Sequence, residues 1–181
     1  MPEQALVSVF IDFHNICPTN RGWDMDFDRL IELTDRFGTV TNRFIYIIDF
    51  DIMRLEHERH GSGFGHMLKD KGFTVREKQI RRVYDTQKGT VHSFGNHDVE
   101  IAIDVMDTLH NGPVDTIMLF SGDGDFCPLL KRVQERRRKI HTIVVSWEKQ
   151  ASRELVRLAH EYIPLERHKS ELQLQSDTAR A

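Results

Sequence analysis

Residues 115–126 read "DTIMLFSGDGDF", a short apolar run that ends in two aspartates, each preceded by a glycine. An apolar run of this length predicts a strand that is buried on both faces, as in a parallel sheet. Neighbouring carboxylates repel each other, and burying a charge is costly unless that charge is paired or coordinated. The stretch therefore predicts a strand whose carboxyl end faces a positively charged partner.

Apolar, β-branched runs alternate with longer helical patterns along the rest of the chain. Strands are predicted at residues 6–12, 43–49, 73–80, 115–121, 140–146 and 161–165. Helices are predicted at residues 27–37, 52–71, 97–110, 127–138 and 151–161, although the three glycines within 57–66 also fit a loop. This alternation indicates βαβ units, and hence an α/β fold with a parallel sheet and helices on both faces.

The length and composition of the chain predict one cytoplasmic domain. Its 181 residues have a formal net charge of -3, so no overall attraction to nucleic acid or to a membrane follows. The two cysteines are far apart, and no segment approaches the roughly 20 apolar residues of a membrane span. The start of the chain lacks the features of a signal peptide. We expect a domain over residues 1–167 and a polar, flexible tail over residues 168–181.

Four aspartates are expected at one edge of the sheet, because ligands of open parallel sheets bind outside the carboxyl ends of the strands. Asp12 ends the first strand, Asp123 and Asp125 follow the fourth, and Asp98 opens a helix. Such a set suits Mg²⁺ or Mn²⁺, which could support attack of water on a phosphodiester. Taken singly, Asp12 also fits a turn residue and Asp98 a helix cap. Asp123 is the stronger ligand candidate, whereas Asp125 could act through water or order the turn.

These residues lie in motifs that resemble a known family. The motifs are "VFIDFHNI" (9–16), "DVEIAIDVM" (98–106), "TIMLFSGDGDFCPLLKRVQERRRKIHTIVVS" (116–146) and "SRELVRLAHEYIPL" (152–165). Together they resemble a NYN domain of the LabA-like group, a branch of the PIN-like nucleases. The resemblance implies a three-layer α/β/α PIN-like (Rossmann-like) fold with a central, mainly parallel sheet. It also implies a ribonuclease that depends on Mg²⁺ or Mn²⁺.

The resemblance implies roles for individual residues. The acidic, metal-binding and catalytic set would be Asp12, Asp98, Asp123 and Asp125. Asn15 and Ser121 match supporting positions, and Asp104 matches a recurrent acid, although the helical spacing places it on a face with Glu100 and Asp107 that looks solvated. The sequence departs from the family at "GNH" (95–97), where family members often have Lys-Gly-Val. The missing lysine puts substrate contacts and catalytic strength in doubt.

Two basic clusters stand out, "REKQIRR" (76–82) and "KRVQERRRK" (131–139). Basic side chains neutralise phosphates, so these clusters could contact RNA, although they also fit solvated surfaces. The residues expected to bind nucleic acid are Arg76, Lys78, Arg81, Arg82, Lys131 and Arg132.

The leading hypothesis is a metal-dependent nuclease that acts on RNA, more readily on single strands, and that could form a homodimer. The alternative is an RNA-binding or regulatory module of the same fold with little or no catalysis. A haloacid-dehalogenase-type phosphatase fits less well, because "DFHN" lacks the second aspartate of DxD after the first strand. A Toprim-type domain also fits less well. Such a domain has a glutamate after one strand and DxD after another; "DGD" fits the second feature, but the first strand of this chain ends in aspartate.

Overall fold

The structure is a computed structural model that describes residues 4–17, 24–48, 63–78, 81–85, 90–94, 96–135 and 139–174. Its strands are β1 (Leu6–Asp12), β2 (Thr39–Ile48), β3 (Thr74–Lys78), β4 (Arg81–Asp85), β5 (Thr90–Phe94), β6 (Thr116–Phe120), β7 (His141–Ser146) and β8 (Glu161–Pro164). Its α-helices are α1 (Phe13–Ile16), α2 (Phe27–Asp35), α4 (Phe64–Asp70), α5 (Asp98–Asn111), α6 (Cys127–Gln134), α7 (Arg153–Leu158) and α8 (Lys169–Leu172). Two 3₁₀ turns complete the set, η1 (Gly124–Phe126) and η2 (Leu165–His168).

Six strands form one sheet in the order β3-β2-β1-β6-β7-β8, and every neighbouring pair is parallel. The central strands are apolar throughout: all five residues of β6 are buried, as are the five inner residues of β1. A parallel strand covered on both faces needs this composition. The predicted parallel α/β fold is therefore confirmed.

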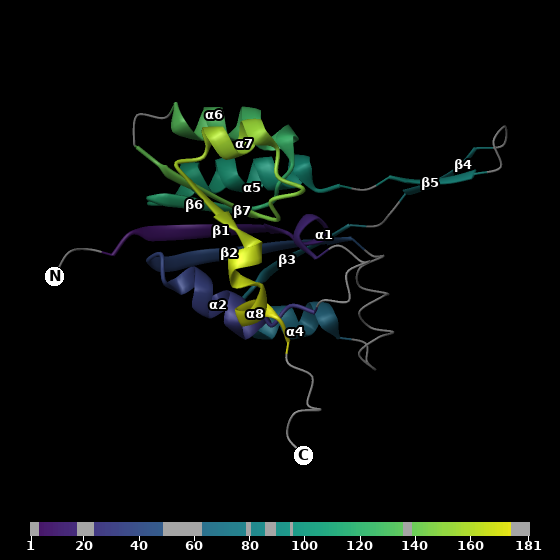
Figure 1. Ribbon diagram of the computed structural model, residues 1–181, viewed down its shortest axis with the longest axis horizontal. Coiled ribbons are helices and arrows are strands. Elements are labelled where there is room, and N and C mark those ends of the chain that lie inside the picture. Colours follow the sequence, from purple (N-terminus) through teal and green to yellow (C-terminus); the bar gives the residue numbers. More distant parts are fainter. Residues whose placement is uncertain are drawn as a thin grey trace, which may run out of the picture.

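Helices cover both faces of the sheet (Figure 1). On one face α5, α6 and α7 pack over a core that includes Phe10, Ile101 and Leu130. On the other face α2, α4 and α8 pack over a second core, which includes Phe27 and Leu68. The strands carry side chains into both cores alternately, and the result is the predicted three-layer α/β/α arrangement.

A two-stranded antiparallel hairpin, β4–β5, was not predicted. It extends away from the three layers in Figure 1 and leads directly into the start of α5. Its strands, "RRVYD" and "TVHSF", lack the continuous apolar runs that mark the buried strands. The basic cluster 76–82 is consequently divided between β3 and β4. Among the described residues, no helix is long and apolar enough to cross a membrane.

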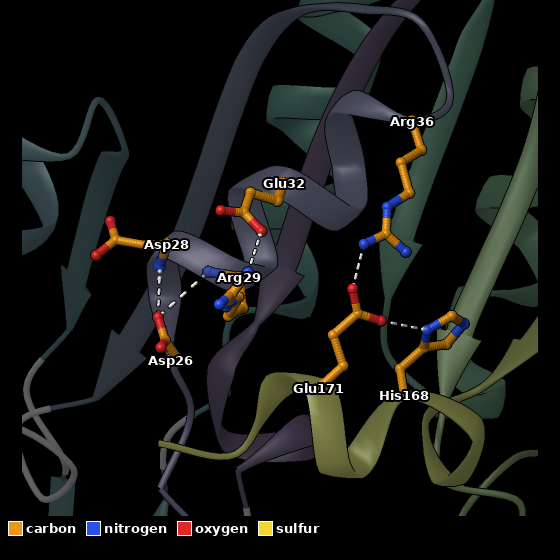
Figure 2. A network of polar contacts seen from close by, with 7 residues as sticks. All are labelled: Asp26, Asp28, Arg29, Glu32, Arg36, His168 and Glu171. Carbon is orange, nitrogen blue, oxygen red and sulfur yellow. Dashed lines mark hydrogen bonds and ion pairs between the residues drawn. The ribbon is translucent and has the colours of Figure 1, made fainter. Parts of the chain in front are cut away.

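Within the segment 168–181, which was predicted to be a polar tail, residues 169–172 form α8 (Figure 2). Leu172 is fully buried in the core under α2. On the surface, Arg36 at the end of α2 pairs with Glu171, whose other oxygen lies 3.2 Å from Nδ1 of His168. Backbone bonds from Asp26 and Leu174 also join the two segments. The polar composition of this segment concealed its one core residue.

Candidate metal centre

The ends of β1 and β6 lie side by side and are joined through one buried hydroxyl. Ser121 Oγ donates a hydrogen bond to Oδ2 of Asp12 at 3.2 Å and accepts one from the backbone N–H of Asp123, also at 3.2 Å. Asp12 Oδ1 accepts a hydrogen bond from the backbone N–H of Asn15, so this carboxylate also caps the short helix α1. Ser121 therefore fixes the relative positions of two of the predicted acids.

The turn after β6 is held from both sides. Its Gly122 N–H donates to Oδ1 of Asn15 at 2.9 Å, and its Gly122 carbonyl accepts from the N–H of Ser152 at 2.8 Å. A Cβ atom on Gly122 would lie 3.0 Å from Cα of Ala151, which is tighter than nine in ten real Cβ contacts. Glycine is favoured here because two backbone segments meet, and their meeting fixes the direction in which Asp123 leaves the sheet.

Three of the four predicted acids converge. Asp98, Asp123 and Asp125 each offer a carboxylate oxygen, and these oxygens all lie within 4.8 Å of one another. Asp123 Oδ1 accepts from the N–H of Asp125 at 3.0 Å, so the Asp123 side chain caps the turn η1. The prediction that Asp123 is the stronger ligand stays a prediction. Asp12 stands beside the trio, and its charge repels that of Asp98.

Two residues that the sequence analysis did not select place Asp98. The Asn96 side-chain amide donates a hydrogen bond to Oδ2 of Asp98. His97 is buried, and its Nε2 lies 3.1 Å from the carbonyl oxygen of Ile47, which ties the start of α5 to the end of β2. Both residues belong to the "GNH" stretch, where the sequence departs from the family pattern. This departure was the sequence signal that could have pointed to them.

Two carboxylates at this edge, Asp12 and Asp98, have raised pKa values. Burial is the largest cause at Asp98, and the charges of Asp123 and Asp125 raise its pKa further. Burial also raises the pKa of Asp12 to about 6, against the opposing effect of its hydrogen bonds from Asn15 and Ser121. In the described part of the chain, no lysine or arginine forms an ion pair with any of these four acids. The edge therefore has an unbalanced negative charge.

The donor set fits a hard divalent cation. Carboxylate oxygens are the ligands that Mg²⁺ and Mn²⁺ prefer, and three of them converging from two separate elements leave room for water in the remaining positions. The mutual repulsion of Asp98, Asp123 and Asp125 would be relieved by such an ion. Asp98, Asp123 and Asp125 are thus the residues that could hold a metal.

Asp104 lies elsewhere, in a satisfied cluster on the flank of α5. Its carboxylate accepts from the hydroxyl of Tyr46 at 2.9 Å and from two nitrogens of Arg76, both at 3.0 Å. The side chain is only 13% exposed, so the expectation of a solvated face was wrong for this residue. The helical spacing placed Asp104 on the right side of α5. The sequence pattern did not show that Tyr46 and Arg76 contact this side of the helix.

The predicted RNA-contacting residues with described side chains already have acidic partners. Arg76 binds Asp104 as above, and Lys78 Nζ lies 2.6 Å from Glu100 and 2.9 Å from the carbonyl of Asn96. The pairs on α6 are Lys131 with Glu154 at 2.9 Å and Arg132 with Glu135 at 3.6 Å. Arg81 and Arg82 belong to β4, but their side chains lie outside the described part of the structure. Lys78 does bring an ammonium group beside the "GNH" stretch.

Comparisons with known proteins show which family and which relatives this chain is similar to. Residues 6–166 match the model of the NYN domain. The chain is 30% identical over 164 residues to the low amplitude and bright protein LabA of Synechococcus elongatus, covering 88% of this chain and 83% of LabA. It is 25% identical over 137 residues to an uncharacterized protein of Methanocaldococcus jannaschii, covering 76% of this chain and 46% of that protein.

The fold also recurs in a crystal structure of a protein of unknown function from Vibrio parahaemolyticus. The two structures share 22% sequence identity with a TM-score of 0.74, over 96% of this chain and 99% of the other. At this identity the likeness concerns the fold alone. NYN domains belong to the PIN-like superfamily, whose members are generally metal-dependent nucleases. The motifs, the sheet order and the match over residues 6–166 together place this chain in the NYN domain family.

Proposed function

We propose that this protein is a ribonuclease that hydrolyses phosphodiester bonds of RNA with a bound Mg²⁺ or Mn²⁺ ion. The observation that carries the proposal is the convergence of Asp98, Asp123 and Asp125 within 4.8 Å at an edge where no described cation balances them. A structural acid is normally paired or fully hydrogen-bonded, as Asp104 is. The acidic trio lacks such pairing among the described residues, and an ion would supply it.

The chain's own residues have distinct roles in this proposal. Asp98, Asp123 and Asp125 hold the ion, and Asp12 completes the acidic set from β1. When bound, such an ion lowers the pKa of water and neutralises charge on the phosphodiester. Ser121 and Asn15 keep β1, α1 and the turn after β6 in register through their hydrogen bonds. Asn96 and His97 position Asp98 at the start of α5.

RNA would approach along the carboxyl edge of the sheet. Lys78 lies there beside Asn96, and the proposal assigns it to a substrate phosphate, together with Arg76 and the arginines of β4, Arg81 and Arg82. Lys131 and Arg132 on α6 would contribute a more distant positive field. Because every one of these contacts with described side chains competes with an acidic partner, binding should weaken steeply as salt rises.

A cytoplasmic homodimer is part of the same proposal. Cys17 and Cys127 are both buried and form no disulfide, which suits a reducing compartment. Val99 and Ile103 lie one turn apart on α5 and are 65% and 54% exposed, which suits an apolar contact between two copies. Sedimentation of the purified chain and of a Val99→Asp, Ile103→Asp variant would measure the oligomeric state directly.

The test is cleavage of a labelled single-stranded RNA in the presence of Mn²⁺, with an EDTA control. We expect cleavage by the natural chain, none in EDTA, and none by Asp12→Asn or Asp123→Asn. Asp107→Asn is the matched control, because Asp107 is an exposed acid on α5 outside the acidic trio. Each variant is checked for folding by circular dichroism and urea unfolding.

Cleavage that persists in a clean preparation of folded Asp123→Asn would overturn the assignment. Binding of RNA without turnover by the natural chain would favour the second candidate, a regulatory RNA-binding module. The specific observation in favour of that candidate is the "GNH" stretch, in which no lysine precedes Asp98.

A further inference from the structure

A groove of about 520 Å³ lies beside the acidic edge. It is formed by the loop after β7, by α7 and by β8. Its lining residues are Glu148, Ala151, Arg153, Val156, Arg157 and Tyr162. None of these residues was singled out by the sequence patterns, and the proposed function does not use them.

The groove and the acidic turn share a wall. Ala151 lines the groove, and a Cβ atom added to Gly122 would lie 3.0 Å from the Cα atom of Ala151. The adjacent Ser152 donates its N–H to the Gly122 carbonyl at 2.8 Å and caps α7 with its side chain. Helix α7 in turn packs against η1, the turn that contains Asp125. A chain lying across the carboxylates would therefore reach this groove directly.

The groove contains two arginines that form no ion pair with another described residue, although the charge of Arg157 adds a smaller effect to that of Lys131 in lowering the pKa of Glu154. Arg153 and Arg157 are exposed and lie one turn apart on α7, and Nε of Arg157 donates to the carbonyl of Arg153 at 3.2 Å. The neighbouring acid, Glu154, is instead paired with Lys131. These guanidinium groups thus differ from Arg76 and Arg132, whose charges are already paired. A pair of guanidinium groups one turn apart matches the oxygens of a phosphate.

Tyr162 adds an aromatic ring to the lining of the groove. The Tyr162 hydroxyl donates to the carbonyl of Ser146 at 3.1 Å, which fixes the ring at the groove wall. Ala151 and Val156 add apolar surface, so a base could stack there without sequence preference. Glu148 supplies a carboxylate that can accept hydrogen bonds from the amino group of a base. The phosphate and the base of a bound nucleotide would consequently contact different residues of the groove.

We propose that this groove binds one nucleotide of single-stranded RNA next to the phosphodiester at the acidic edge. Arg153 and Arg157 hold its phosphate, and Tyr162 stacks on its base. The inference rests on the proposed function, because it names where the substrate of that site continues. The occupant is a single strand, since a duplex would not present an unstacked base to Tyr162.

The test measures affinity for a short fluorescent single-stranded RNA in a non-cleaving Asp123→Asn background with Mg²⁺ present. Adding Arg153→Ala and Arg157→Ala should weaken binding about tenfold and lower the slope of log affinity against log salt by about 1 to 2. Tyr162→Ala should weaken binding similarly, whereas Tyr162→Phe should retain it, because the ring is kept. Arg29→Ala is the matched control and should change affinity less than twofold, since Arg29 lies on α2, which covers the other face of the sheet, and is paired with Glu32.

Wild-type affinity and an unchanged salt slope in the folded double arginine variant would overturn the groove proposal. If the natural chain still cleaves RNA in that case, the proposed function stands and only the groove is wrong. If the natural chain neither binds nor cleaves RNA, the proposed function fails and the groove proposal fails with it.

Discussion

Asp98 and Asp104 lie on the same helix, fewer than two turns apart, in opposite electrostatic surroundings. Asp104 is almost covered, and every contact it makes is favourable: a phenol hydroxyl and both sides of a guanidinium group bind its oxygens. Asp98 faces two other carboxylates, and among the described residues its side chain accepts a hydrogen bond only from the neutral amide of Asn96. The pKa of Asp98 is raised accordingly by burial and by these neighbouring charges.

This difference predicts that Asp104 supports the fold and that Asp98 serves the proposed metal site. The bonds of Asp104 join α5 to β2 and β3, so its removal should cost stability. Removal of Asp98 takes away repulsion instead, so the folded state should tolerate its loss. The two residues should therefore give opposite results in measurements of activity and of stability.

The largest expected effect is on catalysis. Asp98→Asn should lower Mn²⁺-dependent RNA cleavage at least about 100-fold, because one of the three convergent oxygen ligands loses its charge. Asp104→Asn should leave cleavage within a few-fold of the natural chain. Initial rates at saturating Mn²⁺, normalised to folded protein, measure both. Equal losses in the two variants would show that the distinction between these acids is wrong.

Asp12→Asn should stabilise the metal-free protein. The folded pKa of about 6 lies above the ordinary value of 3.8, so the ionised carboxylate is disfavoured in the fold. At pH 7.5 the neutral amide should raise the free energy of unfolding by about 2 kcal/mol. This gain should shrink as pH falls below 6 and vanish near pH 4, where the natural side chain is also neutral. Urea unfolding between pH 4 and 8, in EDTA, gives the profile.

A pH-independent difference between Asp12→Asn and the natural chain would refute this explanation. Asp26→Asn is a useful comparison, because Asp26 also caps a helix but lies on α2, away from the acidic edge. Its substitution should not produce a stability gain at neutral pH.

Asp104→Ala should destabilise the protein by about 2 kcal/mol, because it leaves the Tyr46 hydroxyl and the Arg76 guanidinium without their shared acceptor. The exposure of Arg76 limits the loss, since water can solvate part of the guanidinium. Asp107→Ala on the exposed side of α5 should change stability by less than about 0.5 kcal/mol. The midpoints of urea unfolding of Asp104→Ala and Asp107→Ala test this difference in stability, and equal midpoints would contradict it.

The smallest effect concerns the turn that presents Asp123. Gly122→Ala should cost about 1 to 2 kcal/mol, because the new methyl group meets the backbone of Gln150 and Ala151. Gly112→Ala at the end of α5 has open space and extended backbone, so it should be neutral or slightly stabilising. Thermal unfolding of both variants would measure the difference. A neutral Gly122→Ala would show that the two backbone segments can separate at little cost.

The parallel sheet was predictable because its strands are buried on both faces. The runs that form β1, β6 and β7 are short, apolar and β-branched, and no other environment suits them as well. The β4–β5 hairpin carries no such run, so its pairing could not be seen. Helix α8 was missed because a single buried leucine, Leu172, carries its packing.

The candidate site was predictable as far as strand ends position side chains. Asp12, Asp123 and Asp125 follow strands, and Asp98 begins a helix, so topology alone brings them to one edge. The sequence could not reveal which acids have partners, because Arg76 and Tyr46 reach Asp104 from distant strands. For the same reason it favoured Arg76 over Arg153, although the first is paired and the second is not.

Binding of a divalent ion by the acidic trio would link the folding equilibrium to the concentration of that ion. Any ion that binds Asp98, Asp123 and Asp125 only in the folded chain raises the melting temperature, by an amount that grows with the logarithm of its concentration. At about 100 times its dissociation constant, such an ion would add about 3 kcal/mol to the free energy of unfolding. Melting curves in Mg²⁺, Mn²⁺ and Ca²⁺ would therefore rank the ion preference of the site without any RNA substrate.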